Sequence, residues 1–481
     1  MATPVEVLLV NPNRLRPAVA PVALDYLADT LAAGAVPHRL LDLCFASDPE
    51  GAIQGHLAER QPGLVAVTIR NTDDCYLASG EDFLPGFARL IATIKSCTDA
   101  PVVVGGSGYS ISPDAVLEAV GADYGIAGDG EEPLARLAAA IGGEGDLEGV
   151  PGLVWREGAE ARRNPPWQGP LAELPPRRRA LLDNARYLAE GGQGGIETKR
   201  GCDSPCIYCA DPVGKGRRVR VRSPAQVAAE FEALLAQGVD HVHLCDSEFN
   251  LPADHAAAVC EELAARGLGE RVRWYTYASP EGFTVELAQA MRRAGCVGIN
   301  FGVDSADDGM LLRLGRRFRS ADLWETAAAC RRAGIVCMYD LLLGGPGETP
   351  ETLTHTIQEI NRIAPDRVGV SLGIRIYPST PLAELVRAQG PMAANPNLRG
   401  AVEENEGLLR PVFYLSAALG EEAVGLVARL IGGDQRFFFP TAEVGTEAYN
   451  YSDSERLVAA IRRGLRGAYW DILRRLAEGE G

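Results

Sequence analysis

The sequence predicts an α/β protein in which a doubly wound, Rossmann-like sheet is followed by a partial, TIM-like (β/α)6 barrel and a mostly helical carboxy-terminal region. Short apolar runs alternate with helix-like segments in two stretches of the chain, and a stretch rich in Gly, Pro and charge divides them. A chain of 481 residues is also too long for one ordinary core. We expect a first domain over residues 1–142, a linker over 143–190, the barrel over 191–384 and a capping domain over 385–481.

In the first domain, short apolar runs followed by turn residues predict buried parallel strands. These runs are residues 5–10, 39–44, 64–69 and 101–104. Helix-like stretches such as 22–33 and 83–95 lie between them. Because ligands of doubly wound sheets bind at the carboxyl ends of strands, the residues that follow each run are candidate binding residues.

The second alternation begins at residue 194 and predicts the barrel. Its six expected strands are residues 194–198, 239–244, 271–277, 297–303, 335–343 and 367–376. After Pro381 the strand pattern stops, and residues 420–431 and 454–477 are expected to be helices. We therefore expect the chain to end in helices that pack on the barrel.

Composition limits the class of function. The net charge of −17 argues against general binding to nucleic acid or to an anionic membrane, because both surfaces would repel the chain. No run approaches the roughly 18 apolar residues of a membrane span, and the first residues lack the features of a signal peptide. With 11 cysteines and no export signal, we expect a cytoplasmic protein that acts on a small molecule.

One group of cysteines has the spacing of metal ligands. Cys202, Cys206 and Cys209 form a C-x3-C-x2-C loop directly after the first expected barrel strand. Three thiolates from one loop can hold three irons of a four-iron cluster, whereas an electron-transfer cluster normally takes four cysteines. The fourth iron then stays open, as in a catalytic metal site. The alternative is a noncatalytic zinc or iron–sulfur protein.

This loop, with the aromatic residue Tyr208 just before its third cysteine, resembles the signature of the radical S-adenosylmethionine (SAM) superfamily. The resemblance covers about residues 191–384. It implies a [4Fe-4S] cluster that binds SAM at its open iron and cleaves it to methionine and a 5′-deoxyadenosyl radical. It also implies an external electron donor such as flavodoxin or ferredoxin.

The resemblance extends to acidic residues that would contact SAM. Glu248, with Asp246 as the second choice, stands where relatives carry a Gly-Gly-Glu-like segment that receives the SAM ammonium, although the glycines are missing here. Asp304 occupies a place where relatives contact the ribose or methionyl end of SAM. The alternative for Asp304 is a helix N-cap.

Two further segments match the superfamily. Gly344 and Gly345 belong to a GGPG turn that resembles the turn lying against SAM, and a helix is expected to open at Glu348. Glycines permit such a close backbone approach. The last expected strand places Arg375 and Tyr377 near the barrel mouth, Arg375 as a cofactor contact and Tyr377 as a candidate catalytic residue.

A doubly wound domain before this barrel resembles the cobalamin-binding class of radical SAM enzymes. Small residues at its expected strand ends would surround the nucleotide tail of cobalamin. The D-x-H-x-x-G motif that supplies a cobalt ligand is absent, and His38 and His56 are expected at the surface. Either cobalt has no protein ligand on its lower face or the domain is a scaffold. The expected tail contacts are Asn11, Thr68, Gly105, Gly106, Gly128 and Gly130.

Arg70 follows the third expected strand and is the candidate residue beneath the corrin. A guanidinium does not release its proton at ordinary pH, so it is a poor metal ligand. Its presence would keep the lower face of cobalt free of a protein ligand. The alternative is a surface salt bridge with Asp73 or Asp74.

These resemblances imply a cobalamin-dependent radical SAM methylase that transfers a methyl group, by way of methylcobalamin, to an unactivated carbon of a small metabolite. An enzyme with the same cofactors that rearranges, cyclises or oxidises its substrate is the alternative. The carboxy-terminal helices would close the substrate pocket, with Tyr449, Asn450 and Tyr451 as candidate lining residues.

Overall fold

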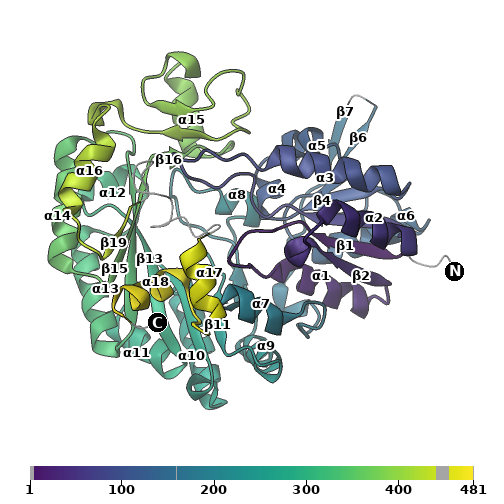
Figure 1. Cartoon of the computed structure of the whole chain (residues 1–481), viewed down its shortest axis with the longest axis horizontal. Coiled ribbons are helices and arrows are strands. Elements are labelled where there is room, and N and C mark those ends of the chain that lie inside the picture. Colours follow the sequence, from purple (N-terminus) through teal and green to yellow (C-terminus); the bar gives the residue numbers. More distant parts are fainter. Residues whose placement is uncertain (1–4, 159, 440–453, 480–481) are drawn as a thin grey trace.

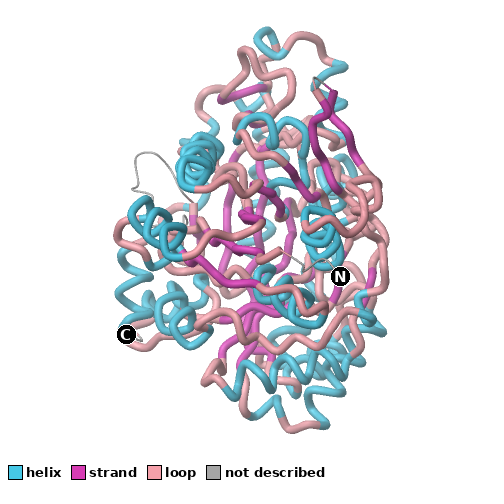
Figure 2. The backbone as a smooth tube through the Cα atoms, turned by 90° about the vertical axis from the view of Figure 1, so that its right-hand side faces the viewer, coloured by secondary structure: helices cyan, strands magenta, loops and turns pink. Residues whose placement is uncertain are grey.

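The computed structural model describes residues 5–158, 160–439 and 454–479. Figure 1 shows two lobes, with the amino-terminal sheet on the right and the barrel on the left. In the view turned by 90°, strands run through the middle of the molecule and helices lie outside them (Figure 2). No helix among the described residues is long and apolar enough to cross a membrane.

The first sheet has seven strands in the order β2-β1-β3-β4-β5-β6-β7. Its five parallel strands are β1 (Val7–Asn11), β2 (His38–Asp42), β3 (Leu64–Thr68), β4 (Val102–Gly105) and β5 (Tyr124–Ile126). The covering helices are α1 (Val22–Ala33), α2 (Pro49–Glu59), α3 (Leu84–Cys97), α4 (Ser107–Ile111), α5 (Pro113–Val120) and α6 (Glu131–Ile141). The expected doubly wound domain is confirmed.

Both faces of this sheet are apolar. Leu8 and Val10 of β1 pack in one core with α2, α3 and α5, whereas Val7 and Leu9 pack in the other core with α1 and α6. Because successive side chains of a strand point to opposite faces, helices on both faces require apolar residues throughout the strand. This arrangement explains the continuous apolar runs of the sequence.

Residues 143–190, expected as a linker, contain regular structure. They form β6 (Leu153–Glu157), β7 (Glu160–Arg163) and α7 (Asn184–Gly191), and both strands extend the first sheet in antiparallel pairing. The strand pattern was hidden because β7 is an exposed edge strand of charged residues and Ala. Charged side chains are typical of edge strands because they block pairing with other chains.

The second sheet is parallel throughout, in the order β19-β15-β14-β13-β12-β11-β8. Gly373, at φ +88°, ends β15, so the last expected strand is divided in two. The six strands expected here are β8 (Gly194–Ile196), β11 (His241–Leu244), β12 (Arg273–Ala278), β13 (Cys296–Asp304), β14 (Val336–Leu343) and β15 (Arg367–Leu372). The outer helices are α9 (Pro224–Ala236), α10 (Ala253–Ala265), α11 (Val285–Arg293), α12 (Asp308–Arg313), α13 (Ser320–Ala333) and α14 (Pro350–Ile363).

The carboxy-terminal region is less uniformly helical than expected. It adds β19 (Phe437–Phe438) to the barrel sheet, and it forms a small antiparallel sheet from β16 (Ile374–Arg375), β17 (Leu398–Gly400) and β18 (Val412–Tyr414). Its helices are α15 (Pro381–Ala388), α16 (Ala423–Ile431), α17 (Glu455–Arg462) and α18 (Tyr469–Ala477). Trp470 of α18 packs with Tyr275 and Met338 of the barrel. The expected lining residues 449–451 lie outside the described residues.

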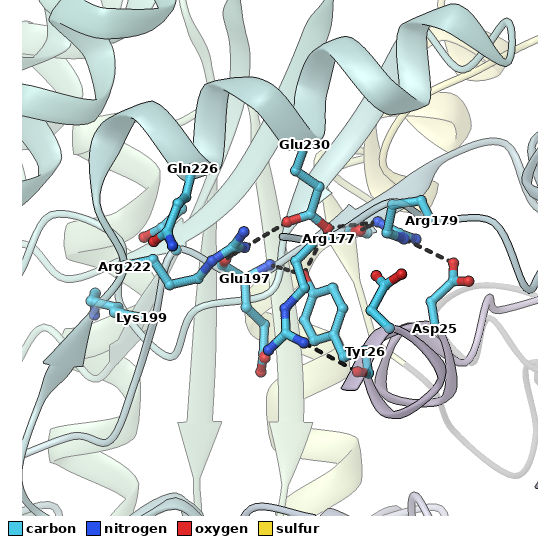
Figure 3. A network of polar contacts seen from close by, with 12 residues as sticks. Asp25, Tyr26, Arg177, Arg179, Glu197, Lys199, Arg222, Gln226 and Glu230 are labelled. Atoms are coloured by element: carbon cyan, nitrogen blue, oxygen red, sulfur yellow. Dashed lines mark hydrogen bonds and ion pairs between the residues drawn. The ribbon is translucent and has the colours of Figure 1, made fainter. Parts of the chain in front are cut away.

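A buried network of charges joins the two lobes (Figure 3). The hydroxyl of Tyr26 on α1 donates to Glu230 Oε1 on α9 (2.8 Å). Arg179, from the connection between the sheets, bonds Asp25 (2.8 Å) and Glu230 (2.9 Å), and these three charged side chains have no exposed surface. Arg222 contacts the second oxygen of Glu230 at 2.5 Å. These contacts fix the orientation of the first sheet relative to the barrel.

Candidate active site

The cysteine loop lies between β9 (Lys199–Arg200) and the short helix α8 (Asp211–Lys215). The backbone N–H of Cys202 donates to Gly216 O (3.1 Å), and that of Cys209 donates to Cys206 O (3.4 Å). Burial raises the pKa of the Cys206 and Cys209 thiols, so their thiolates need nearby positive charge. Three iron ions would supply that charge, and the donor set therefore fits a cluster.

Arg316 is the main cationic residue of the site, and the sequence analysis missed it. Its side chain is 5% exposed, and Nη1 donates to Cys206 Sγ at 3.0 Å. The guanidinium also lies 3.4 Å from Asp304 and 3.7 Å from Glu248. The only sequence signal was the pair of arginines after α12, which has no characteristic spacing.

Glu248 and Asp246 follow β11 but have different surroundings. Asp246 is 2% exposed and accepts hydrogen bonds from Thr198 N (2.8 Å) and Thr198 Oγ1 (2.5 Å), so it holds the segment before the cysteine loop. Glu248 is partly exposed, and burial raises its pKa while the charges of Arg316 and Lys199 oppose this shift. Glu248 is therefore the better placed of the two to accept an ammonium group.

Lys199 is a second cation beside the loop. Lys199 is 4% exposed. Its side-chain ammonium forms no hydrogen bond or ion pair with another described residue. Burial lowers its pKa, and the negative charges of Asp246, Cys202 and Glu248 act against this shift. Figure 3 shows Lys199 at the edge of the charge network that joins the two lobes.

Asp304 ends β13 in a left-handed conformation, at φ +63°. Its Oδ2 accepts a hydrogen bond from the hydroxyl of Tyr208 at 2.5 Å. It is not a helix N-cap, because Asp307 caps α12 by accepting from Met310 N (2.9 Å). The structure thus connects Asp304 directly to the aromatic residue of the cysteine loop.

The GGPG turn is closed by its own acidic residue. Gly344 and Gly345 donate their backbone N–H groups to Glu348 Oε2. The following helix, α14, begins at Pro350 with Thr349 as its N-cap, and not at Glu348 as expected. Burial raises the pKa of Glu348 to about 7. These two N–H groups are therefore occupied by the protein itself.

Arg375 is held by protein partners, and its expected contact with a cofactor stays a prediction. Nε donates to Asp73 Oδ2 (3.0 Å), and the two Nη atoms donate to backbone carbonyls, including Leu408 O (3.2 Å) and Leu409 O (3.2 Å). Nε thus joins the barrel to the loop after β3, and the Nη atoms hold the segment before β18. Its guanidinium stacks over the ring of Tyr377, 4.7 Å from the centroid.

Tyr377 faces the loop after β3. Its hydroxyl lies 2.8 Å from the sulfur of Cys75, which is exposed and adopts φ +62°. Desolvation raises the pKa of the Tyr377 hydroxyl, so the phenol is protonated at neutral pH. The pair joins the first lobe to the end of the barrel, and a catalytic role for Tyr377 stays a prediction.

At the strand ends of the first lobe, the expected tail contacts separate into two groups. Asn11 is fully buried and donates to Asp42 Oδ1 (2.9 Å) and Tyr187 OH (3.0 Å), so its side chain is structural. Gly106, at φ +107°, leaves no room for a Cβ, which would lie 2.6 Å from Ile69 O. Gly105 and Thr68 adjoin it at the ends of paired strands.

Gly128 and Gly130 lie after β5, near the lobe interface. Gly128 has φ +87° and donates its N–H to Ser110 Oγ (3.0 Å) on α4. Asp129 between them bonds Arg220 at 2.7 Å. This turn is therefore tied to both lobes, and its contact with cobalamin stays a prediction.

Arg70 follows β3 and is exposed, and its side chain forms no ion pair with any other described residue. The expected alternative of a salt bridge fails, because Asp73 pairs with Arg375. Desolvation raises the pKa of Tyr277 on β12, and the charge of Arg70 opposes this rise. Burial also raises the pKa of Tyr469 on α18, and the charge of Arg70 again opposes the rise. The charge of Arg70 therefore lies close to β12 of the barrel and to α18.

The two early histidines do not lie at the carboxyl ends of strands. His38 begins β2, and its Nδ1 is 2.9 Å from Val36 O. His56 lies in α2, and burial lowers its pKa. Both are partly exposed. Neither stands where a ligand of a doubly wound sheet would bind.

The fold and this site define a radical SAM enzyme with a cobalamin-binding domain. The radical SAM superfamily model matches residues 196–360, and the B12 binding domain model matches residues 14–138. Tryptophan 2-C-methyltransferase of Streptomyces laurentii is 30% identical over 96% of this chain and 95% of that enzyme. The chain belongs to the cobalamin-dependent radical SAM methyltransferases.

Solved structures agree with this assignment. The methyltransferase TsrM from Kitasatospora setae, with tryptophan and a SAM analogue bound, is 33% identical with a TM-score of 0.91, and 98% of each chain is covered. OxsB shares the fold at 18% identity and a TM-score of 0.72, covering 90% of this chain and 67% of its own. The predicted cofactors, a [4Fe-4S] cluster, SAM and cobalamin, are confirmed.

Proposed function

We propose that this chain transfers a methyl group from SAM to C2 of the indole ring of tryptophan. The observation that carries the proposal is the near-complete correspondence with tryptophan 2-C-methyltransferase, which spans 96% of this chain. The tryptophan-bound TsrM structure covers 98% of it. The correspondence therefore extends beyond the two cofactor domains into the carboxy-terminal region.

The interior of the barrel supports an aromatic amino acid as substrate. By the alternation of each strand, His243, Tyr277, Asn300 and Asp340 face away from the outer core. The ring centroids of His243 and Tyr277 are 4.9 Å apart. Two such rings can pack against a third aromatic ring. Asn300 Nδ2 donates to Asp340 Oδ2 at 2.7 Å. An indole with a cationic amino group matches these aromatic and carboxylate surfaces.

When bound, the cluster and SAM supply redox and methyl-donor chemistry, and cobalamin supplies a carrier for the methyl group. For the chain itself, we propose that Glu248 receives the ammonium of SAM. Arg316 would hold the carboxylates of Glu248 and Asp304 in place. Arg70, whose charge lies close to β12 without an ion pair to the described residues, would lie beneath the corrin. Gly105 and Gly106 would leave room for the nucleotide tail.

The reaction also requires an electron donor and a compartment in which the thiols stay reduced. All 11 cysteines are free, which suits a reducing cytoplasm. We propose that a small carrier protein delivers single electrons to the cluster from outside the molecule.

The position of methylation is tested with tryptophan that carries deuterium at C2. Anaerobically reconstituted enzyme, SAM and a chemical reductant should give methyltryptophan that has lost the deuterium. A variant with Cys202, Cys206 and Cys209 changed to Ala is the control and should give no product. Methylated product that keeps the deuterium would contradict C2 as the site, and no methylation of tryptophan under these conditions would contradict the substrate.

A further inference from the structure

Lys199 is a buried cation that no described residue pairs with. It stands three residues before Cys202, the first cysteine of the cluster loop. The residue is 4% exposed, and its ammonium has no hydrogen-bond or ion-pair partner in the described part of the chain. Removing an ammonium from water without a partner is costly, so a folded protein retains one where a negatively charged group binds.

The use of lysine at this position departs from the rest of the chain. Of the 47 lysine and arginine residues only three are lysine, namely Lys95, Lys199 and Lys215. Two of these three enclose the cysteine loop, one on each side. An ammonium is a compact charge with three donors, whereas a guanidinium is a planar fork. A compact donor suits a small closed space beside a group that has several acceptor atoms.

The Lys199 side chain projects from β9 away from the first lobe. Its neighbour Arg200 bonds the two carboxylate oxygens of Glu131 on α6, at 2.9 and 2.8 Å. Because successive side chains of a strand point to opposite faces, Lys199 projects to the other side. β9 pairs with β10 (Arg220–Val221), and this pairing closes the base of the segment that contains the cysteine loop. The ammonium therefore lies at the base of that segment.

The carboxylates near Lys199 are held by other groups. Burial lowers the pKa of Lys199, and the charges of Asp246 and Glu248 are among those that oppose this shift. Asp246 accepts hydrogen bonds from Thr198 N (2.8 Å), Thr198 Oγ1 (2.5 Å) and the backbone N of Lys199 (3.3 Å). Glu248 lies 3.7 Å from the guanidinium of Arg316. Neither carboxylate is within ion-pair distance of the Lys199 ammonium.

Two other cations beside the loop already have carboxylate partners. Lys215 Nζ lies 3.1 Å from Asp211 Oδ2, and Arg316 lies 3.4 Å from Asp304. The charges of these two residues are thus matched by the protein. The charge of Lys199 is left for the group that the three cysteines hold.

We propose that the ammonium of Lys199 is a counter-charge for the [4Fe-4S] cluster and raises its reduction potential. A cluster held by three thiolates carries net negative charge, and reduction adds one more unit. A nearby positive charge and hydrogen bonds to the sulfurs therefore favour the reduced form. The electron comes from the reductant, and no bond forms or breaks at Lys199. The inference does not depend on the identity of the substrate.

The test is a redox titration of the anaerobic holoenzyme without SAM. Dithionite is the reductant, and electron paramagnetic resonance of the reduced cluster is the readout. Lys199→Met keeps most of the side-chain volume but removes the charge. It should lower the equilibrium constant for reduction by about tenfold or more, which is a shift of about 59 mV to more negative potential. Lys199→Arg keeps the charge and should give a potential closer to that of the unmodified enzyme.

Lys95→Met is the matched control. It removes one positive charge from the exposed surface of α3, where Lys95 pairs with Asp123 at 2.7 Å, and it should leave the potential unchanged. Equal potentials in Lys199→Met and the unmodified enzyme would overturn the proposal. Equal shifts in Lys199→Met and Lys199→Arg would also overturn it, because packing and not charge would then set the potential.

The stability of the apoprotein separates a counter-charge from a structural residue. Without the cluster the ammonium is buried and unpaired, so apo Lys199→Met should unfold at a urea concentration no lower than the unmodified apoprotein does. A lower midpoint would show that Lys199 holds other protein groups, against the proposal. An unchanged potential combined with weaker binding of SAM would assign the ammonium to the SAM carboxylate and would equally overturn it.

Discussion

Arg316 shows how the candidate site balances charge at the scale of single residues. It contacts Cys206 and lies within ion-pair distance of Asp304 and Glu248, three groups that the sequence predicted separately. The cysteines could be predicted because their spacing is fixed within one loop. Arg316 could not, because it lies 110 positions along the chain from Cys206. The ion pair of Arg375 could not be predicted for the same reason, since its partner Asp73 belongs to the other lobe.

Replacing Arg316 by Met should lower the free energy of unfolding of the apoprotein by about 3 kcal/mol, because it leaves the buried carboxylate of Asp304 and the partly exposed carboxylate of Glu248 without their cation. Urea unfolding measures this loss. Arg317→Met is the control, since its pair with Asp203 is exposed and should contribute less than about 1 kcal/mol. Equal effects of the two substitutions would show that Arg316 does not hold the site together.

Glu348 should give the protein a specific pH dependence. Its pKa is about 7 in the folded protein and 4.5 in its ordinary state, so the folded state binds the proton more tightly. The free energy of unfolding should therefore fall between about pH 4.5 and 7, by about 3 kcal/mol from this group, and then level off.

Glu348→Gln cannot become charged. It should remove the fall in the free energy of unfolding between about pH 4.5 and 7, as measured by urea unfolding. Glu351→Gln, on the exposed first turn of α14, should keep the slope of the unmodified protein. A slope unchanged by Glu348→Gln would show that the buried carboxyl titrates normally.

At the scale of elements, the sequence predicted the buried strands more reliably than the edge strands and the contacts between distant elements. The six barrel strands and the four expected strands of the first lobe are present, because continuous apolar runs identify strands covered on both faces. β7 and β19 were missed, one because it is a polar edge strand and the other because it has two residues. The charge network between α1 and α9 was also missed, because it joins residues about 200 positions apart.

Glu230→Gln should lower the free energy of unfolding by about 3–5 kcal/mol, because it leaves Arg179 and Arg222 buried without their shared carboxylate. Glu232→Gln on the same helix is the matched control. Its exposed pair with Arg266 (3.1 Å) should contribute less than about 1 kcal/mol. Similar losses for both substitutions would argue against a structural role for the network.

Gly105→Ala should weaken cobalamin binding on the order of tenfold without destabilising the apoprotein. Its Cβ would meet Ile126 O at 3.6 Å, an ordinary contact, yet it would enter the space expected for the nucleotide tail. Titration followed by visible absorption measures the affinity. Gly86→Ala on α3, where a Cβ meets nothing within 4 Å, should bind cobalamin normally. Normal binding by Gly105→Ala would remove Gly105 from the cofactor site.

At the scale of the whole molecule, the two lobes place the cysteine loop of the barrel beside the strand ends of the first sheet. Gly214 of α8, directly after the loop, lies against Ser107 and Ser110 of α4. The sequence predicted both cofactor domains from local motifs, and the comparisons confirm them. It could not predict the substrate, because the residues of the barrel interior come from separate strands and carry no motif.

The assembled enzyme is expected to transfer an intact methyl group from SAM to its substrate. Mass spectrometry of the product formed from tryptophan and methyl-deuterated SAM measures this transfer. We expect a product in which one CD3 group has replaced one hydrogen, together with S-adenosylhomocysteine. A product of unchanged mass, or one that is two hydrogens lighter, formed with 5′-deoxyadenosine and without S-adenosylhomocysteine, would contradict it.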